Sequence, residues 1–246
     1  MVEALREKGP GLFVLVDPER TTPSAAADLA RVAEREGVTG LLIGTSFDGA
    51  ARTAQVAAAI KGASALPLLL FPGSASQLVA EVDGVLLLSL VSGRNPQYLI
   101  EEHVRSVPFF DRSRKVTVIS TGYILVDGGR ITAVESVSQT RPLPADKPEL
   151  AAAHALAARM IGMSAVYLDA GSGAAHPVPP AVVAACRAAV PQGVTLFVGG
   201  GIRTPAEAGA ARKAGADFVV IGTAVEEGSD DSWRTQIEAF VRAVSA

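Results

Sequence analysis

Two glycine-rich segments in the last quarter of the chain have residue types that suit phosphate binding. Gly200 and Gly201 follow an apolar run and come shortly before Thr204, which opens a helix-like stretch, and Gly222 and Thr223 follow the next apolar run. Glycine lets backbone N–H groups approach an anion closely, and helix N-termini supply further donors. The two segments therefore predict a phosphate site, although a glycine triplet alone is also compatible with a simple tight turn.

A second group of small and polar residues runs from Tyr167 to Gly173. Asp169 follows an apolar run, and a carboxylate at such a point can orient a hydroxyl or accept its proton. Gly171 and Gly173 flank Ser172, which favours a second anion-binding loop, with a capped turn as the alternative. The Gly-Ser-Gly segment lacks the G-x-S-x-G elbow, so a serine hydrolase is excluded.

A third candidate is the acidic residue Asp17, which ends the first apolar run, together with Ser46 after the second run. Mg²⁺ prefers oxygen ligands and is commonly shared between one or two carboxylates and substrate phosphates. The pair therefore predicts a Mg²⁺ site. For Asp17 the structural alternative is an N-cap of the next helix.

Eight short apolar runs alternate with alanine-rich helical stretches, and each run is nearly continuous in Val, Leu and Ile, as in parallel strands covered on both faces. With 246 residues, close to the roughly 250 of a (β/α)8 barrel, the pattern predicts one TIM-barrel domain over residues 1–246. The predicted strands are Leu12 to Val16, Gly40 to Ile43, Pro67 to Phe71, Gly84 to Leu88, Lys115 to Ile119, Ala165 to Leu168, Val194 to Val198 and Asp217 to Ile221. The clearest helices are Pro23 to Glu36, Asp146 to Ile161, Pro179 to Val190 and Pro205 to Ala214.

Two connections depart from this alternation. The stretch from Gly73 to Asp83 is short, so its helix, the third of the barrel, is expected to be reduced or missing. The stretch from Thr121 to Leu143 is long and contains Asp-Gly-Gly, a turn signal that favours a small hairpin of Ile124 to Val126 with Ile131 to Val137.

The barrel prediction places all three groups of polar residues at one end of the molecule. Active sites of this fold lie at the carboxyl ends of the strands, and the loops after strands seven and eight commonly bind phosphate. Asp17 and Ser46 would then lie across the mouth from Gly200 and Gly222, with Asp169 between them. This arrangement predicts a site for two substrates, each bearing phosphate.

Composition restricts the remaining possibilities. The net charge of −3 argues against a broad nucleic-acid surface, and the single cysteine, Cys186, rules out an intrachain disulfide or a cysteine-based zinc site. No apolar run approaches the ~18 residues of a membrane span and no signal segment opens the chain, so we expect a cytoplasmic protein. His103 and His154 lie in helical stretches and are interpreted as surface or packing residues, whereas His176 follows Gly173 and is a weaker candidate for substrate contact.

Seven motifs taken together resemble one known family. The sequence is similar to geranylgeranylglyceryl phosphate synthase and its heptaprenylglyceryl phosphate synthase relatives, and the Ala-Gly-Ser-Gly and Asp-Gly-Gly segments resemble the second of the family's two sequence groups. The motifs, in chain order, are Val16-Asp17-Pro18, Gly44-Thr45-Ser46, Phe71-Pro72-Gly73, Ser92-Gly93-Arg94-Asn95-Pro96, Thr121-Gly122-Tyr123-Ile124, Tyr167 to Gly173, and Val198-Gly199-Gly200-Gly201-Ile202.

The resemblance implies a reaction and roles for individual residues. A prenyl group, geranylgeranyl in the first instance, passes from a polyprenyl diphosphate to the C3 hydroxyl of sn-glycerol 1-phosphate, forming an ether and releasing diphosphate. Mg²⁺ would be held by Asp17 and Ser46, catalysis would involve Asp169 and Tyr167, and the protein would be a dimer or hexamer, as its relatives commonly are. Residues implied to contact glycerol phosphate are Tyr167, Leu168, Asp169, Ala170, Gly171, Ser172, Gly173, Gly200, Gly201, Gly222 and Thr223.

One residue departs from the family pattern, because many members carry glutamate where this chain has Asp169. The shorter side chain withdraws the carboxylate by roughly 1 Å, a displacement that can cost about 100-fold in rate unless the backbone or a water compensates. An apolar groove for the prenyl tail is expected near Ser89 to Gly93 and Tyr123 to Val126. Two alternatives remain: another phosphate-binding barrel enzyme, such as an isomerase or lyase, and a non-catalytic phosphometabolite-binding protein.

Overall fold

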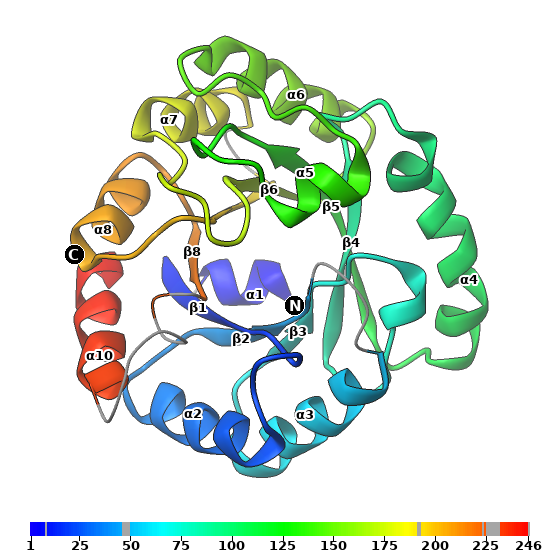
Figure 1. Cartoon of the computed structure of the whole chain (residues 1–246), viewed down its shortest axis with the longest axis vertical. Coiled ribbons are helices and arrows are strands. Elements are labelled where there is room, and N and C mark those ends of the chain that lie inside the picture. The colour runs from blue at the N-terminus through cyan, green and yellow to red at the C-terminus, as the bar shows by residue number, and fades with distance from the viewer. Residues whose placement is uncertain (8, 46–49, 191–192, 223, 225–231, 246) are drawn as a thin grey trace.

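Eight parallel strands form a closed barrel in the computed structural model, which describes all residues except 8, 46–49, 191–192, 223, 225–231 and 246 (Figure 1). Each strand pairs with the next in chain order, and β8 pairs with β1. The predicted (β/α)8 barrel is therefore confirmed. The strands are β1 Gly11–Val16, β2 Gly40–Ile43, β3 Leu68–Leu70, β4 Gly84–Leu90, β5 Thr117–Leu125, β6 Ala165–Asp169, β7 Thr195–Gly199 and β8 Phe218–Ile221.

Helices cover the outside of the barrel, and the four helices predicted most clearly are α2, α6, α7 and α8 with slightly different ends (Figure 1). The described α-helices are α1 Val2–Glu7, α2 Pro23–Arg35, α3 Ala50–Ala63, α4 Glu102–Arg112, α5 Ala133–Ser138, α6 Pro148–Met160, α7 Pro180–Ala189, α8 Pro205–Lys213 and α10 Ser232–Ser245. A π-helical turn, η2 (Gln97–Glu101), leads into α4.

Alternate residues of each strand pack on opposite sides of the barrel wall. Phe13, Phe197 and Phe218 are fully buried inside the barrel, with ring centroids 5.1–5.7 Å apart. The outward residues pack under the helices, where alanine-rich helix faces allow close approach. Both layers of apolar side chains explain why the strand sequences are continuous rather than alternating.

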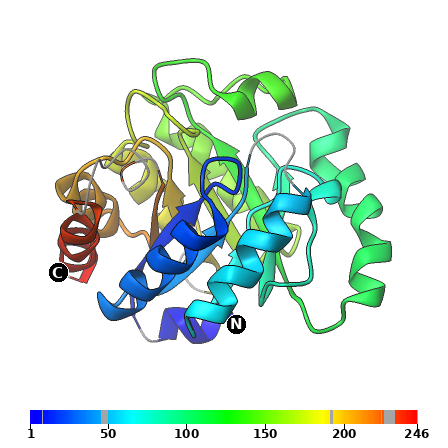
Figure 2. The same ribbon diagram turned by 60° about the horizontal axis from the view of Figure 1, so that its bottom comes forward.

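The two ends of the barrel differ. Helix α1, which the sequence analysis did not identify, lies at one end and places Leu5 in the inner cluster with Leu42 and Leu69. Helix α5 lies at the opposite end, over the carboxyl ends of the strands (Figure 2). The candidate site residues lie at this second end, at the carboxyl ends of the strands.

The connection between β3 and β4 contains only η1 (Ala75–Gln77), a single 3₁₀ turn, so the expected reduction of the third helix is confirmed. Polar contacts replace the helix in holding this connection. Glu102 of α4 accepts a hydrogen bond from the amide of Ala75 at 2.7 Å, and Gln77 accepts one from the amide of Gly73 at 2.6 Å. Among the described elements, η1 thus takes the place of a full helix between α3 and α4.

The predicted hairpin after strand five is wrong. Ile124 belongs to β5, which extends to Leu125 because its second half, from Thr121, pairs with β6, and residues 133–138 form α5. The Asp-Gly-Gly segment does turn, with the Asp127 carboxylate accepting a hydrogen bond from the Gly129 amide at 2.8 Å, but it leads to a helix. Predicted strand five also ended too early, because Thr121 and Gly122 are residue types typical of loops.

Candidate active site

A large cavity opens at the carboxyl ends of the strands, with a volume of about 1510 Å³ that includes part of its open mouth. One side of the cavity is formed by small residues of the loops after β6, β7 and β8, and the other by apolar residues near β4, η1 and α4. Predicted site residues that line it are Asp17, Tyr167, Asp169, Ser172, Gly173, Gly200, Gly201 and Gly222. The structure thus brings together candidates from both halves of the chain.

Asp169 ends β6, and its side chain is held at both oxygens. Oδ1 accepts a hydrogen bond from the amide of Gly171 at 2.7 Å, and Oδ2 accepts one from the hydroxyl of Tyr123 at 2.5 Å. Burial raises the pKa of Asp169, and the two hydrogen bonds partly offset this effect. A buried carboxylate with a raised pKa is a better proton acceptor than a solvated one.

Tyr167 lies inside the barrel, two residues before Asp169 on β6. Its ring stacks on Phe71, with centroids 4.7 Å apart, and on Phe197, with centroids 5.9 Å apart. Burial and the nearby Asp169 carboxylate raise its pKa well above the usual value, so its hydroxyl stays protonated. Gly199 is required beside it, because a Cβ there would lie 2.4 Å from the Tyr167 hydroxyl.

The loop after β7 has a backbone that only glycine adopts without strain. Gly200 and Gly201 have φ values of +76° and +70°. A Cβ on Gly200 would lie 2.2 Å from Oδ1 of Asp169, and one on Gly201 would lie 2.5 Å from the carbonyl oxygen of His176. The loop is therefore packed directly against the carboxylate and the β6 loop, which explains the glycine triplet more fully than a tight turn alone.

The sequence analysis expected the start of α8 to supply amide donors to a phosphate. Thr204 and Glu207 form a capping box, and the Glu207 carboxylate accepts hydrogen bonds from the amides of Arg203 and Thr204 at 2.8 and 2.9 Å. These two amides are engaged within the helix start, and Pro205 has no N–H to donate. The amides of Arg203 and Thr204 are therefore not available to a phosphate, which leaves the amides of the glycine loop as candidate donors.

Some predicted contact residues point away from the cavity. Leu168 and Ala170 are buried in the outer cluster under the helices, as strand alternation requires for neighbours of Asp169. Gly171 has φ +90° and is packed against Thr132, so its role is to turn the loop and to donate its amide to Asp169. Thr223 lies outside the described residues, as does Ser46.

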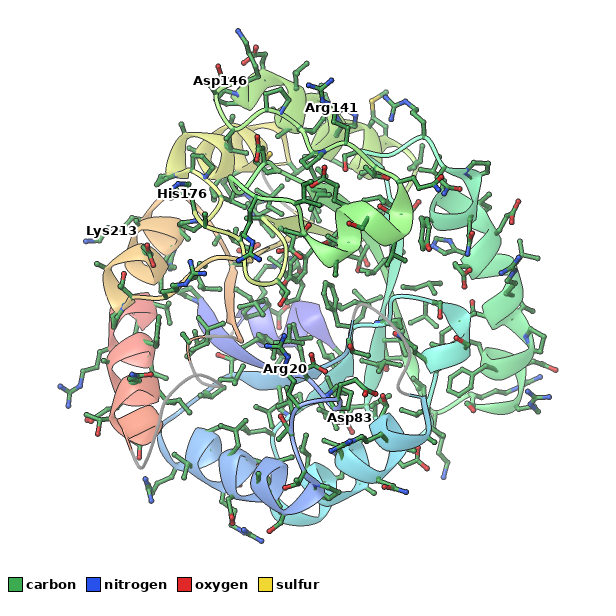
Figure 3. All side chains as sticks on the ribbon, in the orientation of Figure 1. Arg20, Asp83, Arg141, Asp146, His176 and Lys213 are labelled. Atoms are coloured by element: carbon green, nitrogen blue, oxygen red, sulfur yellow. The ribbon has the colours of Figure 1, made fainter. Side chains whose placement is uncertain are left out.

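Asp17 lines the opposite side of the mouth, and its Oδ1 accepts a hydrogen bond from the amide of Glu19 at 2.9 Å. Arg20 approaches its Oδ2 at 3.8 Å and lies near the centre of the mouth in Figure 3. The N-cap interpretation is wrong, because helix α2 is capped by Thr22, whose side chain accepts from the amide of Ala25. Among the described residues, no group of three His, Cys, Asp or Glu side chains lies together as a metal site.

The apolar side of the cavity is built from several elements. Leu78 after η1, Leu88 of β4 and Val137 of α5 line it, and so does His103 of α4, whose Nε2 lies 2.8 Å from the Leu88 carbonyl oxygen. The interpretation of His103 as only a surface or packing residue therefore missed a cavity wall. His176 instead packs behind the glycine loop and is seen at the rim in Figure 3.

Comparison with known proteins identifies the family. The family model described as the PcrB family matches residues 3–243. The chain belongs to the PcrB family. Among curated members, a geranylgeranylglyceryl phosphate synthase from Zunongwangia profunda is 44% identical over 219 residues, covering 88% of this chain and 91% of that protein. Another from Thermofilum pendens is 42% identical over 247 residues, covering 99% and 92%.

A solved structure supports the same assignment to the PcrB family. It is the (S)-3-O-geranylgeranylglyceryl phosphate synthase from Thermoplasma acidophilum in complex with its substrate sn-glycerol-1-phosphate. The TM-score is 0.91 at 28% identity, and the match covers 99% of this chain and 98% of the other. The resemblance seen in the seven sequence motifs is therefore confirmed.

Two residues have contacts at this PcrB-family site that the sequence did not reveal. Tyr123 was placed after strand five, where it was expected to line the prenyl groove, so its contact with Asp169 was missed. Arg203 lines the cavity beside the glycine loop and was treated only as part of that loop. For Tyr123 the available signal was alternation, since Tyr123 and Leu125 both face inward from β5.

Proposed function

We propose that this chain is a prenyltransferase that joins the geranylgeranyl group of its diphosphate to the C3 hydroxyl of sn-glycerol 1-phosphate. The observation that carries the proposal is the position of Asp169, which lies in one cavity between glycine loops on one side and apolar residues on the other. Two substrates of unlike chemistry can meet only at such a boundary. Membership of the PcrB family and the names of its curated relatives support the same reaction.

Glycerol phosphate would bind on the glycine side. Its phosphate would be held by the loops that contain Gly200, Gly201, Gly222 and Thr223. The backbone of Gly200 and Gly201 has the positive φ values that suit close contact between amides and an anion. Ser172 and Gly173, which also line the cavity, would contact the glycerol part. Anchoring the phosphate in this way would present the C3 hydroxyl to Asp169.

The proposed chemistry uses Asp169 as the proton acceptor. The C3 oxygen forms a bond to C1 of the prenyl group, the C1–O bond to diphosphate breaks with its electron pair leaving on the diphosphate, and the hydroxyl proton passes to Asp169. Burial raises the pKa of this carboxyl group, which favours proton transfer to it. Tyr167, stacked between Phe71 and Phe197, would form the rigid floor beneath the reacting atoms.

Mg²⁺ would bind with the diphosphate beside Asp17, with Ser46 as a second oxygen ligand. The donor set fits, because Mg²⁺ in such sites is held by one or two protein oxygens and chiefly by phosphate oxygens. When bound, the ion neutralises charge on the leaving diphosphate. The Asp17 carboxylate lies at the mouth, where its contact with Arg20 at 3.8 Å adds a second positive charge near the same place.

The prenyl tail would lie against the apolar side of the cavity, near the connection that has only η1 in place of a full helix. Leu78, Leu88 and Val137 supply apolar surface there. Geranylgeranyl is the donor that the relatives' names support. A polar floor at His103 and Ser106 bounds the same space.

We also propose that residues 1–246 act as one domain and that copies of the chain associate as dimers or hexamers. Ile100, Val104 and Val107 are 55–65% exposed around η2 and α4, an apolar row that suits a contact between copies. None of the described helices has the length and apolar character needed to cross a membrane. A cytoplasmic location remains a prediction from the sequence.

Product analysis tests the proposed reaction. Purified protein is incubated with sn-glycerol 1-phosphate, Mg²⁺ and geranylgeranyl diphosphate, and the lipid fraction is examined by mass spectrometry. We expect an ether product and released diphosphate, with both formed at only a small residual rate in Asp169→Asn and strongly reduced in Asp17→Asn. Absence of an ether product with this donor and with shorter and longer prenyl donors would refute the proposal. Conversion of glycerol phosphate to a different product without added metal would favour a metal-independent isomerase or lyase instead.

A further inference from the structure

We propose that Tyr123 is a positioning residue that fixes the Asp169 carboxylate in its reactive orientation. The proposal rests on the role of Asp169 as proton acceptor proposed above. Tyr123 comes from β5, which pairs in register with β6 so that Tyr123 lies beside Tyr167 and Leu125 beside Asp169. The Tyr123 side chain extends along the barrel axis toward the level of the Leu125–Asp169 pair, and its hydroxyl donates a hydrogen bond to Oδ2 of Asp169 at 2.5 Å.

The Tyr123 ring has little freedom to move. It is 4% exposed, and it packs against Phe71 and Tyr167, with ring centroids 6.0 and 5.8 Å away. The hydroxyl is therefore held in place by the ring rather than by solvent. A short hydrogen bond from a rigid donor restricts rotation of the carboxylate more than one from a flexible side chain.

Three sides of the Asp169 carboxylate are then defined. The Gly171 amide holds Oδ1 at 2.7 Å, the Tyr123 hydroxyl holds Oδ2 at 2.5 Å, and the backbone of Gly200 closes off the face next to Oδ1. An ionised carboxylate has about four lone-pair sites, so lone pairs remain for a substrate hydroxyl. The arrangement compensates for the short reach of aspartate by removing its freedom to turn away.

Electrostatics supports the same role. Burial raises the pKa of Asp169, and the Tyr123 hydrogen bond opposes that rise, because it stabilises the ionised form. Burial and the nearby carboxylate raise the pKa of Tyr123 well above its usual value, so the phenol remains a donor at neutral pH. Tyr123 thus keeps Asp169 both oriented and available to accept a proton.

The substitution Tyr123→Phe removes only the hydroxyl, so it separates the effect of the hydrogen bond on Asp169 from the packing of the ring. We expect kcat to fall about 10- to 100-fold, the loss typical for a hydrogen bond to a charged group, with KM for glycerol phosphate nearly unchanged. The acidic limb of the rate profile should move to higher pH, because the pKa of Asp169 rises when the hydrogen bond is lost. The matched control is Tyr98→Phe, whose hydroxyl instead donates to the Val137 carbonyl oxygen at 3.3 Å, and it should leave the acidic limb where it is.

Titration of the Asp169 carboxyl carbon by ¹³C NMR, without substrate, tests the positioning role apart from catalysis. A higher pKa in Tyr123→Phe, together with no further rate loss when Tyr123→Phe is added to Asp169→Asn, supports the proposal. An unchanged pKa, or rate losses that simply multiply in the double variant, overturns it. If instead the pKa rises but Asp169→Asn keeps the wild-type rate, positioning is upheld and the proton-acceptor role in the proposed function is what fails.

Discussion

Replacing Gly200 with alanine measures how tightly the glycine loop is fitted against the Asp169 carboxylate. The new Cβ would lie 2.2 Å from Oδ1 of Asp169 and 2.6 Å from the amide nitrogen of Gly171. The backbone φ of +76° adds a cost of about 1–2 kcal/mol for a residue other than glycine. Because the methyl group overlaps Oδ1, Asp169 must turn away from Gly171 and lose a charge-assisted hydrogen bond worth about 1.5–3 kcal/mol.

These two costs predict that Gly200→Ala lowers the free energy of unfolding by about 2.5–5 kcal/mol. The displaced carboxylate should also reduce kcat by about 100-fold, the effect of roughly 1 Å of misplacement. Urea denaturation at pH 7 measures the first quantity, and steady-state ether formation at saturating substrates measures the second. Both measurements are made on the same preparation.

Gly162→Ala provides the matched control, since Gly162 has φ +90° at the end of α6 but no atom lies within 4 Å of the position that its new Cβ would occupy. It should lose only the conformational cost of about 1–2 kcal/mol and keep the wild-type kcat. The difference between the two variants isolates the overlap with Asp169. Equal losses of unfolding free energy in both variants, or an unchanged kcat in Gly200→Ala, would refute the packing argument.

Three further predictions concern stability and reactivity. Burial raises the pKa of Asp169, so its ionised form destabilises the folded state at neutral pH. Asp169→Asn should therefore unfold at a higher urea concentration than wild type at pH 7. The difference in unfolding free energy should shrink as the pH falls through the raised pKa of Asp169. Asp217→Ala should lower the free energy of unfolding, measured by urea denaturation, by about 1–3 kcal/mol, because Arg187 and the Leu196 amide lose their acceptor at 2.9 and 2.7 Å. The control Asp111→Ala breaks an exposed ion pair and should change the free energy of unfolding by less than about 0.5 kcal/mol. Burial raises the pKa of the Cys186 thiol to about 12, so a thiol reagent at pH 8 should label it only after denaturation, and rapid labelling of the folded protein would contradict its burial.

The barrel was predictable from sequence because its strands are buried on both faces and therefore appear as continuous apolar runs. Strand β5 was the exception. Its upper part contains Thr121, buried with its hydroxyl bonded to the Ile119 carbonyl oxygen, and Gly122, whose missing Cβ makes room for Ala158. Residues that allow close packing of a helix on the strand thus resemble loop residues. The short helix α1 gave no signal because it is too brief to show a period.

The candidate site was predictable where it depends on chain order and not where it depends on register. The glycine loops and Asp17 follow their strands directly, so the fold alone brings them to one mouth. Leu168, which the resemblance implies as a substrate contact, has its side chain in the outer cluster, because a residue next to an inward Asp169 must face outward; its side chain therefore does not line the cavity. The contact between Tyr123 and Asp169 depends on how β5 and β6 pair, and a shift of one residue would have turned the tyrosine to the helices.

The short connection between β3 and β4, which contains only η1, distinguishes this side of the barrel from the side of the glycine loops. A full helix in that connection would cover the outer face of β4 and close the route past Leu78 and Leu88, leaving a mouth suited only to small phosphorylated molecules. The polar contacts from Glu102 and Gln77 hold the shortened connection in place, so the opening does not depend on disorder. Because the glycine loops of β7 and β8 lie on the far side, Asp169 at the end of β6 lies between the proposed phosphate site and the apolar side of the cavity. An enzyme that joins a glycerol phosphate to a long hydrocarbon needs that order of parts.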